Sequence, residues 1–244
     1  MKNLLCLDFD GVICDSIKEC LLITYNSYLE LNNQGQRMVC SVENISPKVS
    51  EVFNKYRYLV RPASHYWMLM ELIDKGVYEI SEELFFSKLV GKESELKAFE
   101  KIFFSNRERL MKEETEFWMS LNTIYPHFME YYTKYGNENY YIVTNKNGSA
   151  VKTILDYYSI KIKNSNLFSK ERFTTKESAL REVVKYNELS YGNILFVDDS
   201  PATIEELLPV FKNSYLANWG YYKNEKKLKS VNTLLELRNL IIEK

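Results

Sequence analysis

The chain has 244 residues, a formal net charge of -1, 45% hydrophobic residues and 27% charged residues. This length suits one large domain or a core with a smaller inserted domain, and the balanced charge argues against a nucleic-acid-binding protein. No apolar run is long enough to cross a membrane and four cysteines (Cys6, Cys14, Cys20 and Cys40) match no zinc pattern, so we expect a cytoplasmic protein with reduced thiols.

The first predicted element is a buried strand from Asn3 to Phe9, a short apolar run that ends in acids. Gly11 then marks a tight turn. A helix is expected to open at Asp15 or Ser16, where Ser16 and Glu19 have the spacing of a capping box.

From this helix to about Ser120 the sequence predicts helices and no strand. Glycines and prolines divide this stretch into further helices, expected at Lys48–Leu59, at Ser64–Lys75, at Ser81–Val90 and over a longer segment after Ser94. An all-helical insert directly after the first strand indicates a separate cap, which we place at residues 16–120.

After this insert the pattern changes to strands that alternate with helices. Strands are expected at Asn139–Thr144, Ile194–Asp198 and Ser214–Ala217. Helices are expected at Pro126–Tyr135, Ser149–Tyr158 and Glu177–Tyr186. Another should follow Ser200, which suits the N-cap, with Pro201 at the first helical position. A last helix is expected from Ser230 onward, where Arg238 interrupts an apolar stripe of Val231, Leu234, Leu235, Ile241 and Ile242. The fold class is therefore α/β, a Rossmann-like doubly wound parallel sheet formed by residues 1–15 and 121–244, with the all-helical cap inserted.

Two pairs of acids follow predicted strands, at the sheet edge where open α/β sheets place their active sites. Asp8 and Asp10 close the first strand, and Asp198 and Asp199 close a later one. Clustered carboxylates are costly without a cation, and a hard divalent ion with oxygen ligands would remove that cost. One carboxylate of the first pair could then attack phosphorus while the other moves a proton. A polar turn or a helix cap would explain each pair taken alone, although Ser200 already occupies the capping position.

Two further features suit a phosphoryl group. Thr144 and Asn145 would offer a hydroxyl and backbone N–H groups after a strand, and Lys176 would bring a compact positive charge to the start of a helix. In isolation, a simple Thr-Asn turn would explain the first feature at least as well, and a solvated lysine would explain the second better.

Together and in this order, these segments resemble the haloacid dehalogenase superfamily, in its phosphoglycolate phosphatase and β-phosphoglucomutase-like branch. DFDGVICDS resembles its first motif, IVTN the second, Lys176 the third and VDDS the fourth. IYPHFMEYY resembles the return from cap to core, and LANWGYY resembles a late segment of phosphoglycolate-phosphatase-like members.

The resemblance implies a role for each matching residue. Asp8 would form an aspartyl-phosphate and Asp10 would be the general acid and base, with its backbone carbonyl on a Mg²⁺ ion. Gly11, Thr144 and Asn145 would bind the phosphoryl group, and Lys176 would orient it together with Asp8. Asp8, Asp10, Asp198 and Asp199 would form the metal site. Many relatives have proline after the motif-three lysine where this chain has Glu177, so Lys146 and Lys170 remain alternatives for that role.

The expected function is magnesium-dependent hydrolysis of a small phosphorylated metabolite by a monomer or homodimer, with no nucleic acid or membrane as partner. A sugar-phosphate mutase with the same chemistry and a catalytically silent phosphate-binding relative are the alternatives. The cap would select the substrate, with Arg61 or His65 as candidate contacts near the break at Pro62, although both would equally suit a solvated surface.

Overall fold

The computed structural model describes residues 3–32, 38–136, 140–222, 227–237 and 240–241. The chain divides into two compact units, one formed by residues Met1–Asp15 and Thr123–Lys244 and the other by Ser16–Asn122. We call them the core unit and the helical unit. Among the described helices, none combines the length and the hydropathy that spanning a bilayer requires.

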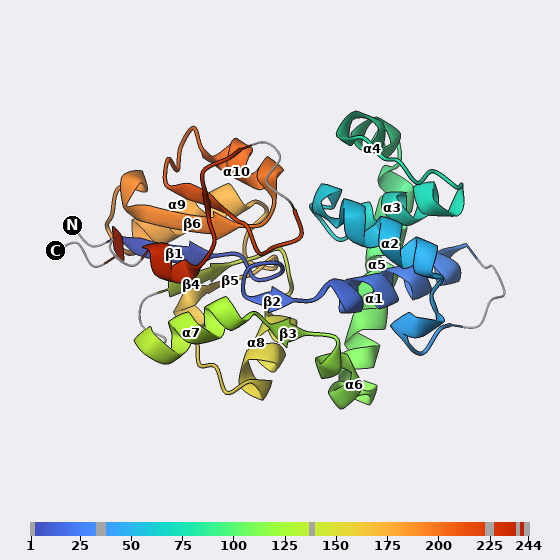
Figure 1. Ribbon diagram of the computed structural model, residues 1–244, viewed down its shortest axis with the longest axis horizontal. Coiled ribbons are helices and arrows are strands. Elements are labelled where there is room, and N and C mark those ends of the chain that lie inside the picture. The colour runs from blue at the N-terminus through green and yellow to red at the C-terminus, as the bar shows by residue number, and fades with distance from the viewer. Residues whose placement is uncertain (1–2, 33–37, 137–139, 223–226, 238–239, 242–244) are drawn as a thin grey trace. The chain divides into compact units, whose positions relative to one another are not determined.

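The core unit is built on a parallel sheet of six strands (Figure 1). The order across the sheet is β5-β4-β1-β6-β7-β8. The strands are β1 (Leu4–Leu7), β4 (Tyr140–Val143), β5 (Leu167–Phe168), β6 (Ile194–Asp198), β7 (Ser214–Ala217) and β8 (Ser230–Val231). All residues of β1, β4 and β6 are buried, which explains why these strands are continuous apolar runs rather than alternating ones.

Helices cover both faces of this sheet, as a doubly wound fold requires (Figure 1). On one face lie α7 (Pro126–Tyr135) and α8 (Gly148–Tyr157), and on the other lie α9 (Lys176–Tyr186) and α10 (Pro201–Leu207). Short 3₁₀ helices occupy Asn164–Asn166, Tyr191–Asn193 and Leu234–Leu237. The predicted α/β architecture is thus confirmed.

A small second sheet lies where the chain leaves and re-enters the core unit. Strand β2 (Cys14–Asp15) pairs antiparallel with β3 (Thr123–Ile124). Strands of two residues carry too little periodicity to be found in a sequence, and neither was predicted.

The C-terminal segment corrects one expectation. Ser230 and Val231, expected to open a helix, instead pair with Leu216 and Ala217 as strand β8. The 3₁₀ turn of Leu234–Leu237 follows, with Leu234 and Leu237 buried. The apolar spacing that suggested one long helix serves a short edge strand and a tight turn, and among the described residues of this segment only Leu240 and the buried Ile241 are α-helical as expected. Arg238 and Ile242 lie outside the described residues, as does Asn139 at the start of the strand expected there.

In the part of it that the structure describes, the helical unit contains no strand, as expected. Its helices are α1 (Ile17–Leu31), α2 (Pro47–Tyr56), α3 (His65–Asp74), α4 (Glu82–Leu89), α5 (Glu93–Glu113) and α6 (Thr115–Ser120), with 3₁₀ turns at Val42–Asn44 and Arg57–Leu59. Their core is strongly aromatic: Tyr66 stacks between Phe53 and Phe103 at centroid distances of 5.4 and 5.5 Å.

The predicted capping box at the start of α1 does not form. The Ser16 side chain makes no capping hydrogen bond, and Glu19 is fully buried instead. Its carboxylate accepts two hydrogen bonds from Arg107 of α5, at 2.6 Å from Nε and 2.9 Å from Nη2. Glu19 therefore forms a bidentate ion pair with a buried guanidinium instead of a local helix cap.

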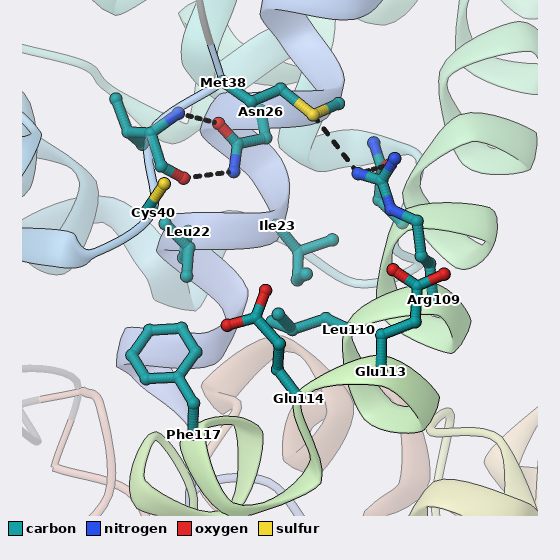
Figure 2. A pocket seen from close by; sticks show the side chains of 12 residues that line it. Leu22, Ile23, Asn26, Met38, Cys40, Arg109, Leu110, Glu113, Glu114 and Phe117 are labelled. Carbon is teal, nitrogen blue, oxygen red and sulfur yellow. Dashed lines mark hydrogen bonds between the residues drawn. The ribbon is translucent and has the colours of Figure 1, made fainter.

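A cavity of about 200 Å³ lies between α1 and α5 within the helical unit (Figure 2). Leu22, Ile23 and Leu110 contribute apolar wall. On one side Asn26 holds the backbone of Val39, accepting from its N–H and donating to its C=O, both at 2.9 Å.

Candidate active site

Three buried carboxylates meet at the carboxyl edge of the main sheet. Asp8 follows β1 directly, Asp198 ends β6, and Asp199 comes next in the chain. Since β1 and β6 pair in parallel, with Leu7 opposite Val197, their ends lie side by side. One oxygen from each of the three acids lies within 4.8 Å of the others. The sheet thus brings together acids that are about 190 residues apart in the chain.

Lys176 is the cation that contacts this group. Its Nζ lies 2.8 Å from Oδ2 of Asp8 and 2.6 Å from Oδ2 of Asp198. Lys176 is the first residue of α9, and a reciprocal capping box between Thr175 and Ser178 fixes that helix start. Although burial lowers the pKa of Lys176, Asp198 and Asp8 outweigh burial and hold the pKa above its ordinary value, so the ammonium stays charged.

The electrostatics of the group favour a divalent cation. Three buried acids lie close together, and Lys176 contacts two of them, Asp8 and Asp198. Burial, followed by repulsion from Asp198 and Asp199, raises the pKa of Asp8 to about 8 even though Lys176 acts in the opposite direction. All three ligands offer oxygen, the donor that Mg²⁺ prefers. The residues present therefore fit a magnesium ion.

Backbone groups hold the two acids of the fourth motif. The N–H of Ser200 donates to Oδ1 of Asp198 at 2.9 Å, and the N–H of Tyr221 donates to Oδ2 of Asp199 at 3.1 Å. Ser200 also caps α10 as expected, accepting from the N–H of Thr203. The contact from Tyr221 was not predicted, because only the fold reveals that residues after β7 return to the site.

Two glycines leave the space that Asp199 occupies. A Cβ on Gly11 would lie 2.4 Å from the Asp199 carboxyl carbon, and a Cβ on Gly220 would lie 2.3 Å from its Cβ. Gly11 also has a φ of +81°, which side chains other than glycine rarely adopt. The tight turn predicted at Gly11 therefore has a second function, which is to let Asp199 approach the loop that follows β1.

Asp10 lies outside the three-carboxylate group and has a different partner. Strand β1 ends at Leu7, so Asp10 lies three residues beyond the strand that it was expected to close. Its Oδ1 lies 3.1 Å from Nζ of Lys146, whose side chain is fully buried. From the sequence, Lys146 was only an alternative to Lys176 for the role of the motif-three lysine.

The loop after β4 carries the expected phosphoryl-binding residues. Thr144 is buried and its N–H donates to the carbonyl of Phe168. Its hydroxyl accepts from the N–H of Lys146 at 3.0 Å, while Asn145 is exposed. Both residues follow β4, the neighbour of β1, so they stand at the same sheet edge as Asp8.

Arg61 and His65 belong to the helical unit and contact its aromatic side chains. The Arg61 guanidinium lies 5.2 Å from the centre of the Phe86 ring. His65 meets Phe85 and Phe86 edge to face at 6.1 and 6.4 Å.

Comparisons with known proteins place this architecture. No family model and no curated protein matches the chain. Solved structures match it over nearly its whole length. A predicted phosphatase from Clostridium acetobutylicum is 16% identical, with 100% of both chains covered and a TM-score of 0.58. A predicted phosphoglycolate phosphatase from Haemophilus somnus is 16% identical, with 98% of this chain and 97% of that chain covered and a TM-score of 0.59.

A haloacid dehalogenase-like family hydrolase from Streptococcus pneumoniae is 12% identical, with 98% of each chain covered and a TM-score of 0.59. At such identities the likeness concerns the fold alone. The chain has the fold of the haloacid dehalogenase-like hydrolases, and the resemblance seen in its motifs is confirmed at that level.

Proposed function

We propose that the protein is a magnesium-dependent phosphatase that hydrolyses a small phosphomonoester through an aspartyl-phosphate on Asp8. The observation that carries this proposal is the group of three buried carboxylates bridged by Lys176 at the sheet edge. A group of buried acids this close together is unfavourable unless cations offset its charge, and it is typical of sites where a cation and a phosphoryl group bind. The phosphatases among the solved structures of this fold agree with that chemistry.

The residues divide the reaction into two displacements. A carboxylate oxygen of Asp8 attacks phosphorus, and the bond from phosphorus to the leaving oxygen breaks while Asp10 gives that oxygen a proton. Asp10, now ionised, then takes a proton from water as the water attacks phosphorus, and the bond to Asp8 breaks to release phosphate. Lys176 holds Asp8 in place and offsets phosphoryl charge, and the Thr144 hydroxyl is placed to bind a phosphoryl oxygen.

Asp8, Asp198 and Asp199 would hold the magnesium ion, with the Asp10 backbone carbonyl as a further ligand. When bound, the ion supplies positive charge that offsets both the carboxylates and the phosphoryl oxygens. Without it, burial and the neighbouring acids raise the pKa of Asp8 and so favour its protonated, non-nucleophilic form near neutral pH.

The test is turnover of an aryl phosphate with Mg²⁺, with chelator and with the Asp8→Asn variant. We expect activity that requires Mg²⁺, inhibition by Ca²⁺, whose larger coordination shell recruits extra ligands, and a loss of about 10³-fold or more in Asp8→Asn. Full activity in excess chelator, or an active Asp8→Asn enzyme, would reject the proposal. Release of free phosphate rather than an isomerised sugar phosphate separates a phosphatase from a mutase.

The helical unit is proposed to select the substrate. The core residues named above contact only the phosphoryl group, which every phosphomonoester shares. Discrimination between metabolites must therefore come from residues elsewhere, and the helical unit is inserted directly after the loop that carries Asp8 and Asp10.

A further inference from the structure

Lys146 is a second lysine beside the candidate active site, and unlike Lys176 it is fully buried; the mechanism above gives it no role. Its side chain has no exposed surface, and its Nζ lies 3.1 Å from Oδ1 of Asp10. Burying an ammonium is unfavourable unless it is paired and hydrogen-bonded. The position of this buried ammonium beside the proposed general acid therefore suggests a role for Lys146 in the site.

The two lysines Lys176 and Lys146 have different carboxylate partners. Lys176 contacts Asp8 and Asp198, the nucleophile and a metal ligand. Lys146 contacts Asp10, the residue that must exchange a proton with the leaving group and with water.

Asp10 lies outside the strands of the main sheet, and an isolated bridge pairs its backbone with Cys14. It lies three residues beyond the end of β1, within the turn around Gly11, and its side chain remains 16% exposed. If the position of the general acid varies, its proton transfer becomes slower, because the transfer requires hydrogen-bond distance to the reacting oxygen. The aliphatic stem of Lys146 is enclosed, so its ammonium is a fixed point for that carboxylate.

Lys146 is itself anchored to the phosphoryl-binding loop. Its N–H donates to the Thr144 hydroxyl at 3.0 Å, and its C=O accepts from the N–H of Lys170 at 3.4 Å. The loop after β4 thus carries, two residues apart, a group expected to bind the phosphoryl oxygens and a group that holds the general acid.

We propose that Lys146 is the positioning residue for Asp10, setting the general acid against the phosphoryl group through the hydrogen bond that its buried ammonium donates to Oδ1 of Asp10, with the exchanged proton on Oδ2. The inference rests on the proposed phosphatase function. It assigns Lys146 no contact with the substrate, so its effect must pass entirely through Asp10.

A double-mutant cycle tests this directly. Lys146→Met keeps the length of the buried stem and removes the charge, and Lys146→Gln retains a hydrogen-bond donor if the methionine variant folds poorly. Each is combined with Asp10→Asn, and kcat/KM is measured for an alkyl phosphate, whose leaving group needs a proton, and for p-nitrophenyl phosphate, which needs little. Lys152→Met, at an exposed position of α8, is the matched control.

We expect Lys146→Met to lower kcat/KM by roughly 10- to 100-fold on the alkyl phosphate and by less than about 5-fold on p-nitrophenyl phosphate. In the Asp10→Asn background the same change should cost nothing further on either substrate. Equal losses on both substrates, or losses that add to those of Asp10→Asn, would overturn the assignment. Asp8→Asn measured in parallel separates the two proposals: if it abolishes turnover while the cycle is additive, only the role of Lys146 fails.

Discussion

At the scale of single residues, the site depends on how closely the backbone of one loop approaches the side chain of another. Gly11 and Gly220 both border Asp199, and neither leaves room for a Cβ. The position of this acid therefore depends on two residues that have no side chain of their own.

Gly11→Ala should accordingly affect the metal site as well as the fold. We expect a destabilisation of about 1 kcal/mol from the left-handed backbone, and a weakening of Mg²⁺ binding by at least about 10-fold because Asp199 must move. Gly76→Ala is the matched control, since Gly76 has a φ of +75° but open space around it. Mg²⁺ titrations of thermal unfolding would measure both effects, and a similar Mg²⁺ affinity in the two variants would contradict the prediction.

Much of the site was predictable because its residues come directly after strands. Asp8, Thr144, Asp198 and Asp199 all follow buried apolar runs, and parallel strands bring such positions to one edge. Contacts that depend on turn geometry were not predictable. The N–H of Tyr221 on Asp199 and the Lys146–Asp10 pair join segments whose distance in space no sequence spacing encodes.

At the scale of elements, the same distinction separates long helices from short pairings. Helices of ten or more residues carry enough apolar periodicity to be found, whereas β2, β3, β5 and β8 have two residues each and exist only because a partner strand is present. Glu19 illustrates a further limit: its spacing from Ser16 fits a local cap, yet a partner 88 residues away has prevailed.

The Glu19–Arg107 pair joins α1 to α5, so breaking it should weaken the helical unit. Glu19→Gln leaves a buried guanidinium without its counter-charge, and we expect a loss of about 3–5 kcal/mol in the free energy of unfolding. The Trp118 indole also donates to Glu19, at 3.4 Å, so tryptophan fluorescence during urea unfolding would report the change. As a control, Glu108→Gln removes an exposed ion pair with Lys112 within α5 and should lower the free energy of unfolding by less than about 0.5 kcal/mol. Equal effects of the two substitutions would show that burial does not govern this pair.

The start of α3 should respond to acid. Burial, aided by the charge of Arg61, lowers the pKa of His65 from 6.5 to about 4. Because the folded pKa is lower than the unfolded one, the stability that His65 contributes is complete above about pH 6.5 and is lost as the pH falls toward 4. Carboxylates titrate in the same range, so the informative quantity is the difference between the wild type and His65→Leu.

Between pH 7 and pH 4, the free energy of unfolding should fall by roughly 1–2 kcal/mol less in the variant than in the wild type. This difference is smaller than the full pKa shift of His65 implies, because the side chain is only partly buried. Urea unfolding at several pH values would measure it. If the free energy of unfolding changed with pH in the same way in both proteins, His65 would not be the cause of the acid sensitivity.

At the scale of the whole molecule, the proposed function assigns one task to each of the two units. The core unit holds the carboxylates and the lysines to which we assign phosphoryl transfer, and it is the part whose sequence motifs were informative. The helical unit has an aromatic interior and carries none of these groups. Sequence reasoning gave its helical character but little about which of its side chains meet a substrate, because packing residues and recognition residues share the same aromatic and basic composition.

Arg61 offers a test of the proposed division. In the helical unit it is exposed, with its guanidinium over the ring of Phe86. If this unit selects the substrate through Arg61, Arg61→Ala should lower kcat/KM by about 10-fold or more on the preferred metabolite while leaving a small aryl phosphate within about twofold, since the latter offers no group beyond its phosphoryl to recognise. Arg109→Ala, another exposed arginine of the same unit, is the control and should affect neither substrate. The preferred metabolite must first be found by screening phosphorylated compounds with the wild type. Equal losses on both substrates would mean that Arg61 acts on the fold or on the core chemistry, and no loss on either would leave selectivity to other residues of the helical unit.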